Sequence, residues 1–156
     1  MLMRESGRGK LAGGMRWGKA AGTVAAVLVG VVLPAPVAQA ARPAISGGRS
    51  HSLAIKSDGT VRTWGYNDEG QLGNGNNTST NAPIPVPGLS NVVAVAGGAG
   101  HSLALKSDGT VWAWGRNYTG QLGNGSNANT NVPVSVTGVS NVVAVAGGAG
   151  HSLALK

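Results

Sequence analysis

Three histidine–serine pairs are the residues of this chain whose types and spacing could perform chemistry. His51, His101 and His151 are its only histidines, they lie 50 residues apart, and each is followed by Ser-Leu-Ala. A serine in a glycine-rich turn could act as a nucleophile, and histidines that converge could bind a metal ion. The residues around each pair decide whether either chemistry is possible.

The glycine-rich stretch 97–106 comes close to three chemical motifs and misses each by one feature. A nucleophile elbow, G-x-S-x-G, requires glycine where Ala104 stands. A phosphate-binding loop requires lysine directly after its last glycine, whereas Lys106 lies six residues further on. The calcium-binding nonapeptide requires aspartate where Ser102 stands. None of the three motifs is therefore complete.

An internal repeat explains the stretch instead. The sequence SNVVAVAGGAGHSLALK occurs unchanged at 90–106 and 140–156, and residues 41–90 match 91–140 at 29 of 50 positions without a gap. A catalytic serine is used once in a site, whereas a motif that recurs at a fixed period belongs to a repeated structural unit. We therefore expect no catalytic, cofactor-binding or metal-binding residues, and no enzymatic activity.

Each repeat is predicted to be β structure. Apolar runs with alternating patterns, bounded by glycine-rich or polar turns, predict strands in the second repeat at 92–96, 101–106, 110–114 and 133–136. The turn 107–110 contains Asp-Gly, which favours a two-residue type I′ hairpin with positive φ at both central positions. Gly109, and Gly59 in the first repeat, are therefore expected to be structural.

Four short strands in a period of 50 residues are typical of a β-propeller blade. The all-β chain is expected to form two blades, 41–90 and 91–140, and the start of a third, 141–156. The sequences at 47–75 and 97–125 resemble the regulator of chromosome condensation repeat. That resemblance implies a seven-bladed ring of about 350 residues at this period, and a bacterial, secreted and truncated member is expected.

Residues that recur in each copy are interpreted as structural. The histidines fall on different blades, so a hydrogen bond is favoured over metal binding. The tryptophans are expected to pack between blades with a partner for the indole N–H, and the leucines of Gly-Gln-Leu-Gly to fill the space beneath a long loop. These residues are His51, His101, His151, Trp64, Trp114, Gly59, Gly109, Leu72 and Leu122.

Residues that differ between copies are the candidates for partner binding. Loops carry function on a rigid scaffold, and Tyr, Trp and Arg are enriched at binding hot spots. The alternative is a solvated loop whose sequence has drifted without function. The candidates are Tyr66, Asp68, Glu69, Arg116, Tyr118, Arg62 and Trp112.

Residues 1–40 have the order of a secretory signal peptide. A basic region ends at Lys19, an apolar run covers 20–33, and Ala-Gln-Ala at 38–40 forms a cleavage site. The run is shorter than the roughly 20 residues that a membrane-spanning helix needs. Cleavage after Ala40 and a secreted, extracellular product are therefore predicted, with no membrane attachment after the leader is removed.

Charge and cysteine content narrow the remaining possibilities. The leader holds five basic residues and one acidic residue, and the rest of the chain seven and four. This weak, scattered positive charge predicts no nucleic-acid binding. The absence of cysteine excludes disulfides and thiolate metal sites.

The sequence thus predicts an exported, non-enzymatic propeller module that binds a protein or a cell surface without a cofactor. The resemblance also suggests a guanine-nucleotide exchange factor or a secreted inhibitor of an extracellular enzyme. Apolar faces built on Val93, Val95, Leu103, Leu105, Val143 and Val145 are expected to lie open at both ends of the repeats. Such faces favour self-association or a longer parent chain.

Overall fold

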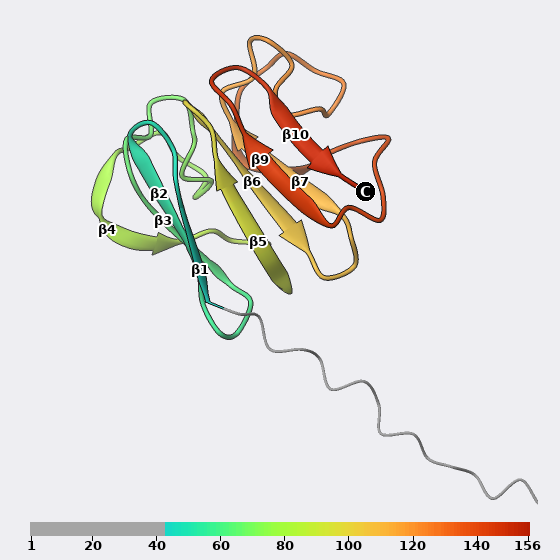
Figure 1. Cartoon of the computed structure of the whole chain (residues 1–156). Helices are drawn as coiled ribbons and strands as arrows, with labels where there is room; N and C mark the ends of the chain where they lie inside the picture. Colours follow the sequence, from blue (N-terminus) through green and yellow to red (C-terminus); the bar gives the residue numbers. More distant parts are fainter. Residues whose placement is uncertain (1–42) are drawn as a thin grey trace, which may run out of the picture. The chain divides into compact units, whose positions relative to one another are not determined.

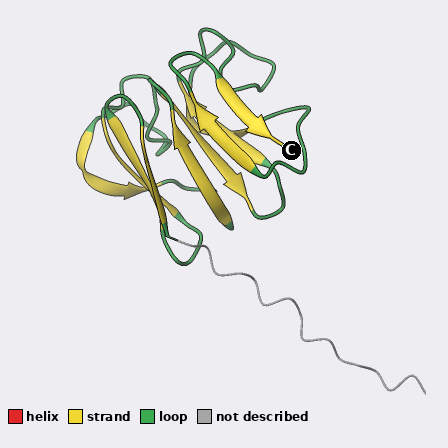
Figure 2. Cartoon of the chain, in the orientation of Figure 1, coloured by secondary structure: helices red, strands yellow, loops and turns green. Residues whose placement is uncertain are grey.

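A computed structural model describes residues 43–156, which form ten β-strands and no helix (Figure 1, Figure 2). The predicted signal peptide and its cleavage site lie outside these residues. Within the described part of the chain, a search for a helix that is long and apolar enough to cross a membrane finds none.

The strands form three antiparallel sheets in chain order. The first sheet contains β1 (Ala44–Gly47), β2 (His51–Ile55), β3 (Val61–Gly65) and β4 (Thr80–Pro85). The second sheet contains β5 (Val92–Gly97), β6 (His101–Lys106), β7 (Val111–Gly115) and β8 (Thr130–Ser135). The third sheet contains β9 (Ala144–Gly147) and β10 (Ser152–Leu155). The prediction of all-β, four-stranded antiparallel blades is confirmed.

The last strand of the second sheet differs from its prediction. β8 begins three residues before Pro133, where the strand was expected to start, and it pairs with β7 only on one side. Its pairing shifts register between Ala113 and Gly115. A proline cannot donate a hydrogen bond to a neighbouring strand, so its place on the edge strand is physically reasonable.

The predicted type I′ hairpin between β6 and β7 is wrong. Gly109 has φ of 77°, whereas Asp108 is not among the residues with positive φ. Lys106 N–H donates to the Thr110 carbonyl at 2.9 Å, which leaves three residues in the loop. A three-residue loop that ends in a left-handed glycine fits the twist of the two strands, and only the glycine needs a positive φ. The Asp108 carboxylate instead accepts the Thr110 backbone N–H at 3.0 Å.

Two layers of apolar side chains separate the sheets. Side chains alternate between the two faces of a strand, so on β6 Ala104 faces the first layer, while Leu103 and Leu105 face the second. The first layer, between the first and second sheets, contains Leu53, Ile55, Val61, Val86, Leu89, Val92, Ala104 and Trp114. The second layer, between the second and third sheets, contains Ala96, Leu103, Leu105, Val111, Ala113, Leu122 and Val142.

The expectation that Leu103 and Leu105 would be open is therefore wrong, because they are only 1% and 3% exposed. The third sheet packs over them, since β9 contacts both β5 and β6. The expectation holds for Val93 and Val143, which are 38% and 66% exposed. Further exposed apolar side chains lie on the first and third sheets. Leu153 and Leu155 on β10 are 60% and 63% exposed, and Ile45 on β1 is 85% exposed.

Candidate functional site

The repeated histidine and serine meet across the boundary between two sheets. His51 Nε2 on β2 lies 2.9 Å from Ser102 Oγ on β6, and the serine hydroxyl donates to the Gln71 carbonyl at 2.8 Å. A hydroxyl has one hydrogen, so the serine oxygen must accept a hydrogen from His51. The histidine is thus a donor to this serine and is not placed as a base that could activate it. Both side chains are buried.

An indole completes this contact. Trp114 Nε1 donates to the same Gln71 carbonyl at 2.8 Å, and the tryptophan side chain is fully buried. Gly73 lies against the ring, because a Cβ built there would be 2.7 Å from Trp114 Nε1. We call His51, Ser102, Gln71 and Trp114 the interface network. The network ties a histidine and a loop carbonyl of the first sheet to a serine and a tryptophan of the second.

Burial keeps the two linking histidines neutral. Desolvation lowers the pKa of both His51 and His101 to about 4. Charge repulsion by the histidine of the following repeat makes a smaller contribution in the same direction. Nδ1 of each ring is buried and has no hydrogen-bond partner among the described residues. A neutral ring with its hydrogen on Nε2 fits both observations, since Nδ1 then carries only a lone pair.

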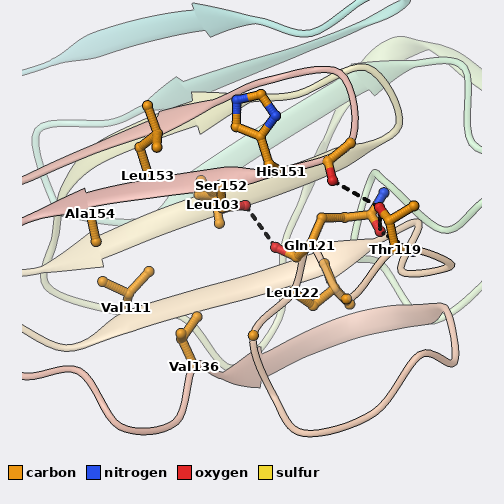
Figure 3. Close-up of a pocket in the computed structure, with 13 residues that line it drawn as sticks. Leu103, Val111, Thr119, Gln121, Leu122, Val136, His151, Ser152, Leu153 and Ala154 are labelled. Atoms are coloured by element: carbon orange, nitrogen blue, oxygen red, sulfur yellow. Dashed lines mark hydrogen bonds between the residues drawn. The ribbon is translucent and has the colours of Figure 1, made fainter.

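The boundary between the second and third sheets repeats only part of this network. His101 Nε2 lies 3.0 Å from Ser152 Oγ, which donates to the Gln121 carbonyl at 2.7 Å. Beside this carbonyl lies a cavity of about 240 Å³ between the second sheet and β10 (Figure 3). His151, the third histidine, is exposed at the mouth of this region. Trp64 lies half-buried on the outer face of the first sheet.

Buried asparagines, which the sequence reasoning missed, hold the long loops. Asn67 donates from Nδ2 to the carbonyls of Asn76 and Thr78 at 2.9 and 3.1 Å, and its Oδ1 accepts the Leu72 N–H at 2.8 Å. Asn117 makes the same three contacts in the second repeat. Leu72 and Leu122 are fully buried beneath their loops. The available signal was that Asn67 and Asn117 stay unchanged among residues that vary.

Five of the seven candidate binding residues come from the two loops that follow β3 and β7. Tyr66 donates to Asp68 Oδ2 at 2.7 Å, which raises the pKa of the Tyr66 phenol. Tyr118 donates across the sheet boundary to Glu69 Oε2 at 3.2 Å, and the Arg116 guanidinium lies 5.3 Å from the Tyr118 ring centre. We call these five residues the loop cluster. Its tyrosines are 47% and 59% exposed.

The other two candidates lie away from the loop cluster. Arg62 on β3 is opposite Ala54, and Trp112 on β7 is opposite Ala104, so they occupy equivalent positions on successive sheets. Trp112 is half-buried against the first apolar layer, with Lys106 Nζ 5.9 Å from its ring centre. The structure therefore places Trp112 in the contact between sheets, and Arg62 on the outer face of the first sheet.

Metal-ligating side chains are dispersed over the sheets. Within residues 43–156, no group of three or more His, Cys, Asp or Glu side chains could hold a metal ion. Each of the three sheets instead contains one histidine, which lies at the start of its second strand or directly before it.

Successive four-stranded antiparallel sheets, each packed against the next, define a β-propeller. The model of the regulator of chromosome condensation (RCC1) repeat matches residues 58–105 and 108–155, and a second RCC1 repeat model matches 44–71 and 92–121. These matches cover more than half of the chain, which therefore belongs to the RCC1 repeat family.

Relatives and solved structures agree with this family. The ultraviolet-B receptor UVR8 of Arabidopsis thaliana is 48% identical over 42 residues, which are 27% of this chain and 10% of the receptor. The structure of human WBSCR16 is 27% identical to this chain with a TM-score of 0.67. The match covers 74% of this chain and 31% of the WBSCR16 chain. Yeast RCC1 (Prp20), in a structure with Kap60, is 27% identical with a TM-score of 0.62. The match covers 72% of this chain and 29% of the yeast chain. The chain thus spans about a third or less of these proteins.

Proposed function

We propose that this protein is an exported, non-enzymatic propeller module that binds a protein partner or a cell surface through the loop cluster. The observation that carries this proposal is the contact of Tyr118 with Glu69, which joins variable residues of two repeats into one exposed surface. Export rests on the signal-peptide pattern of residues 1–40.

The loop cluster has the composition and the support that a binding surface needs. Exposed tyrosines supply large contact area at low entropic cost, and Arg is also common at binding hot spots. The buried amide of Asn67 fixes the first loop from below, and Asn117 fixes the second. A surface that is already ordered loses less conformational entropy when a partner binds.

The solved relatives support a protein partner. Yeast RCC1 (Prp20) has been crystallised with Kap60 bound to it, and Prp20p from Saccharomyces cerevisiae binds Gsp1p and histones. Those partners belong to the named proteins, about a third of whose length this chain covers. What we carry over is the general role of an RCC1 propeller as a protein-binding scaffold.

The orientation of the serine hydroxyl supports a role without catalysis. The hydrogen of Ser102 points to the Gln71 carbonyl, and the serine is fully buried. A nucleophile must reach its substrate and lose its proton to a base. Neither condition suits Ser102, although its oxygen lies 2.9 Å from a histidine nitrogen.

Site-specific photo-crosslinking tests the binding surface. A photo-reactive phenylalanine analogue is placed at Tyr66 or Tyr118 in the full chain, and crosslinked partners from the expressing cells and their medium are identified by mass spectrometry. We expect both positions to capture the same protein, and Arg116→Ala to reduce the capture at Tyr66. Ser140, which is exposed but outside the loop cluster, serves as the control position. Equal capture from Ser140 would contradict the proposal.

Export is tested separately. We expect mass spectrometry of protein from the culture medium to give a chain that begins at Ala41. An intact N-terminus on cell-associated protein would contradict export and leave the crosslinking result standing.

A further inference from the structure

Two segments of the chain have the same sequence, although they belong to different sheets. SNVVAVAGGAGHSLALK at 90–106 contains β5 and β6, and its copy at 140–156 contains β9 and β10. His51 of the first sheet meets Ser102, and Ser152 is the identical residue in the later copy. Misassembly and exchange of equivalent elements are characteristic errors of repeat proteins. Residues outside the two copies must therefore distinguish the correct neighbour of the first sheet.

Most side-chain hydrogen bonds between the first and second sheets cannot make this distinction, because they join residues that recur in both repeats. These residues are His51, Gln71 and Asn77 in the first repeat, and Ser102, Trp114 and Asn131 in the second. Each of them has an identical residue 50 positions away. A first repeat that packed against another first repeat could form the same bonds.

Glu69 makes contacts of a different kind. Its Oε2 accepts the Asn129 side-chain N–H at 2.5 Å and the Tyr118 hydroxyl at 3.2 Å. The first repeat has Ser79 in place of Asn129 and Asp68 in place of Tyr118, and the second repeat has threonine in place of Glu69. Among the side-chain hydrogen bonds described between these two sheets, only those of Glu69 join residues that both differ between the repeats.

Asn129 has two tasks, of which its counterpart performs one. Asn129 Oδ1 accepts the Asn117 backbone N–H at 2.8 Å, just as Ser79 Oγ accepts the Asn67 N–H at 3.0 Å. Either side chain therefore holds its own loop. The longer asparagine also has an amide that donates hydrogen bonds, and this amide reaches across the boundary to Glu69. The additional donor serves the neighbouring repeat and not its own loop.

The other contact adds a penalty against the wrong neighbour. Tyr118 presents a hydroxyl to the Glu69 carboxylate, whereas a first repeat in the same place would present the carboxylate of Asp68. Specificity arises from repulsion of the wrong partner as well as from contact with the right one. Thr119, the counterpart of Glu69, donates instead to the Gly150 carbonyl at 2.8 Å. A repeat offers this backbone group whatever its side chains are, so threonine does not discriminate.

We propose that Glu69 is a specificity-determining residue through which the first repeat selects the second as its neighbour. The surface it fits carries a tyrosine hydroxyl and an asparagine amide, and the surface it rejects is a copy of the first repeat. This selection accounts for the variation at positions 69, 118 and 129 without an external molecule. The proposal goes beyond the proposed function, because the partner is another repeat of this kind.

Thermal melts of the full chain test the contact. Tyr118→Asp/Asn129→Ser gives the second loop the residues of the first, and leaves Glu69 facing a like charge without its two donors. We expect the Tm to fall by about 3–6 °C. Adding Glu69→Thr should restore at least half of this loss, because threonine needs only a backbone acceptor. An unchanged Tm, or a loss that persists with Glu69→Thr, would overturn the proposal.

The reverse exchange on the first loop is the matched control. Asp68→Tyr/Ser79→Asn changes the equivalent two positions, which make no hydrogen bond to Glu69 among the described residues. Its effect on the Tm should be the same whether position 69 holds glutamate or threonine. A dependence on position 69 as large as that of the second-loop variant would show that the coupling is not specific to the second repeat, and would overturn the proposal.

Refolding separates selection from stability. Each variant is unfolded in urea and diluted, and its oligomers are measured by size-exclusion chromatography with light scattering. We expect Tyr118→Asp/Asn129→Ser to give about twice the oligomer share of the unchanged chain, since wrong neighbours then compete equally. The same share should persist after Glu69→Thr, although the Tm recovers, because threonine accepts any neighbour. An oligomer share equal to that of the unchanged chain in both variants would mean that Glu69 stabilises without selecting, and would overturn the proposal.

Discussion

The later sheet contributes four strands at the first boundary between sheets and two, among the described residues, at the second, and this difference separates two sources of stability. Both contain a histidine that donates to a serine and a serine that donates to a glutamine carbonyl. Only the first boundary contains an indole, because β7 supplies Trp114, whereas the third sheet consists of β9 and β10 in the described residues. The first two strands of a sheet thus suffice for the polar contact and for burying Leu103 and Leu105, and the third strand adds the buried indole and its hydrogen bond.

The comparison predicts its largest effect at Trp114. Trp114→Ala removes a fully buried indole and a hydrogen bond, and should lower the free energy of unfolding by about 3–5 kcal/mol. The equivalent Trp64→Ala should lower it by only about 1 kcal/mol, because Trp64 is half-buried on an outer face. Urea unfolding measures both. Similar losses would mean that the outer face is as well packed as the boundary between the sheets.

Gly73 and Gly123 occupy equivalent positions at the two boundaries, so the same substitution can be compared with and without a neighbouring indole. Gly73 and Gly123 have φ of 69° and 61°, so alanine at either position costs about 1–2 kcal/mol in backbone strain. Gly73→Ala should also collide with Trp114, and lose about 2–4 kcal/mol in total. Gly123→Ala faces only a Val136 methyl group at 3.0 Å. Thermal melts should therefore rank Gly73→Ala as the more harmful change, and the reverse order would contradict the packing described.

The histidines predict a pH dependence. The pKa values of His51 and His101 are lowered in the folded state to about 4 from an ordinary 6.5. The unfolded chain therefore binds more protons between these values, and stability that is complete above pH 6.5 declines as the pH falls toward 4. We expect a loss of about 2–3 kcal/mol between pH 7.5 and 5.5, with about half from each histidine. The double variant His51→Gln/His101→Gln should lose this dependence, and a variant that keeps it would point to other groups.

The smallest effect is expected in the loop cluster. Tyr118→Phe removes an exposed hydroxyl whose bond to Glu69 spans the boundary between the first and second sheets. The free energy of unfolding should change by less than about 0.5 kcal/mol, because exposed polar contacts contribute little. A denaturant titration can show this. A loss above about 1 kcal/mol would mean that the loops, rather than the interface network, help to hold the sheets together.

The sequence predicted the sheets better than the contacts between them. The repeat and its apolar alternation located the strands, since these patterns depend on side-chain type. The carbonyl of Gln71 could not be found in that way, because every residue has a carbonyl and only the fold decides which one meets Trp114. The place of Trp112 was also missed, since variation between copies does not distinguish a loop from a strand face. The Asp-Gly pair wrongly predicted a two-residue loop, because the same pair also fits a three-residue loop that ends in a left-handed glycine.

The interface network joins two chemically different faces, and this difference restricts the symmetry of any assembly that uses the same contacts. The second sheet offers His101 and the Gln121 carbonyl on one face, and Ser102 and Trp114 on the other. Two identical faces therefore cannot reproduce these contacts, which excludes a two-fold symmetric dimer formed through the network. Copies that associate through it must meet head to tail. Such contacts produce closed rings when the rotation between copies closes, and open filaments when it does not.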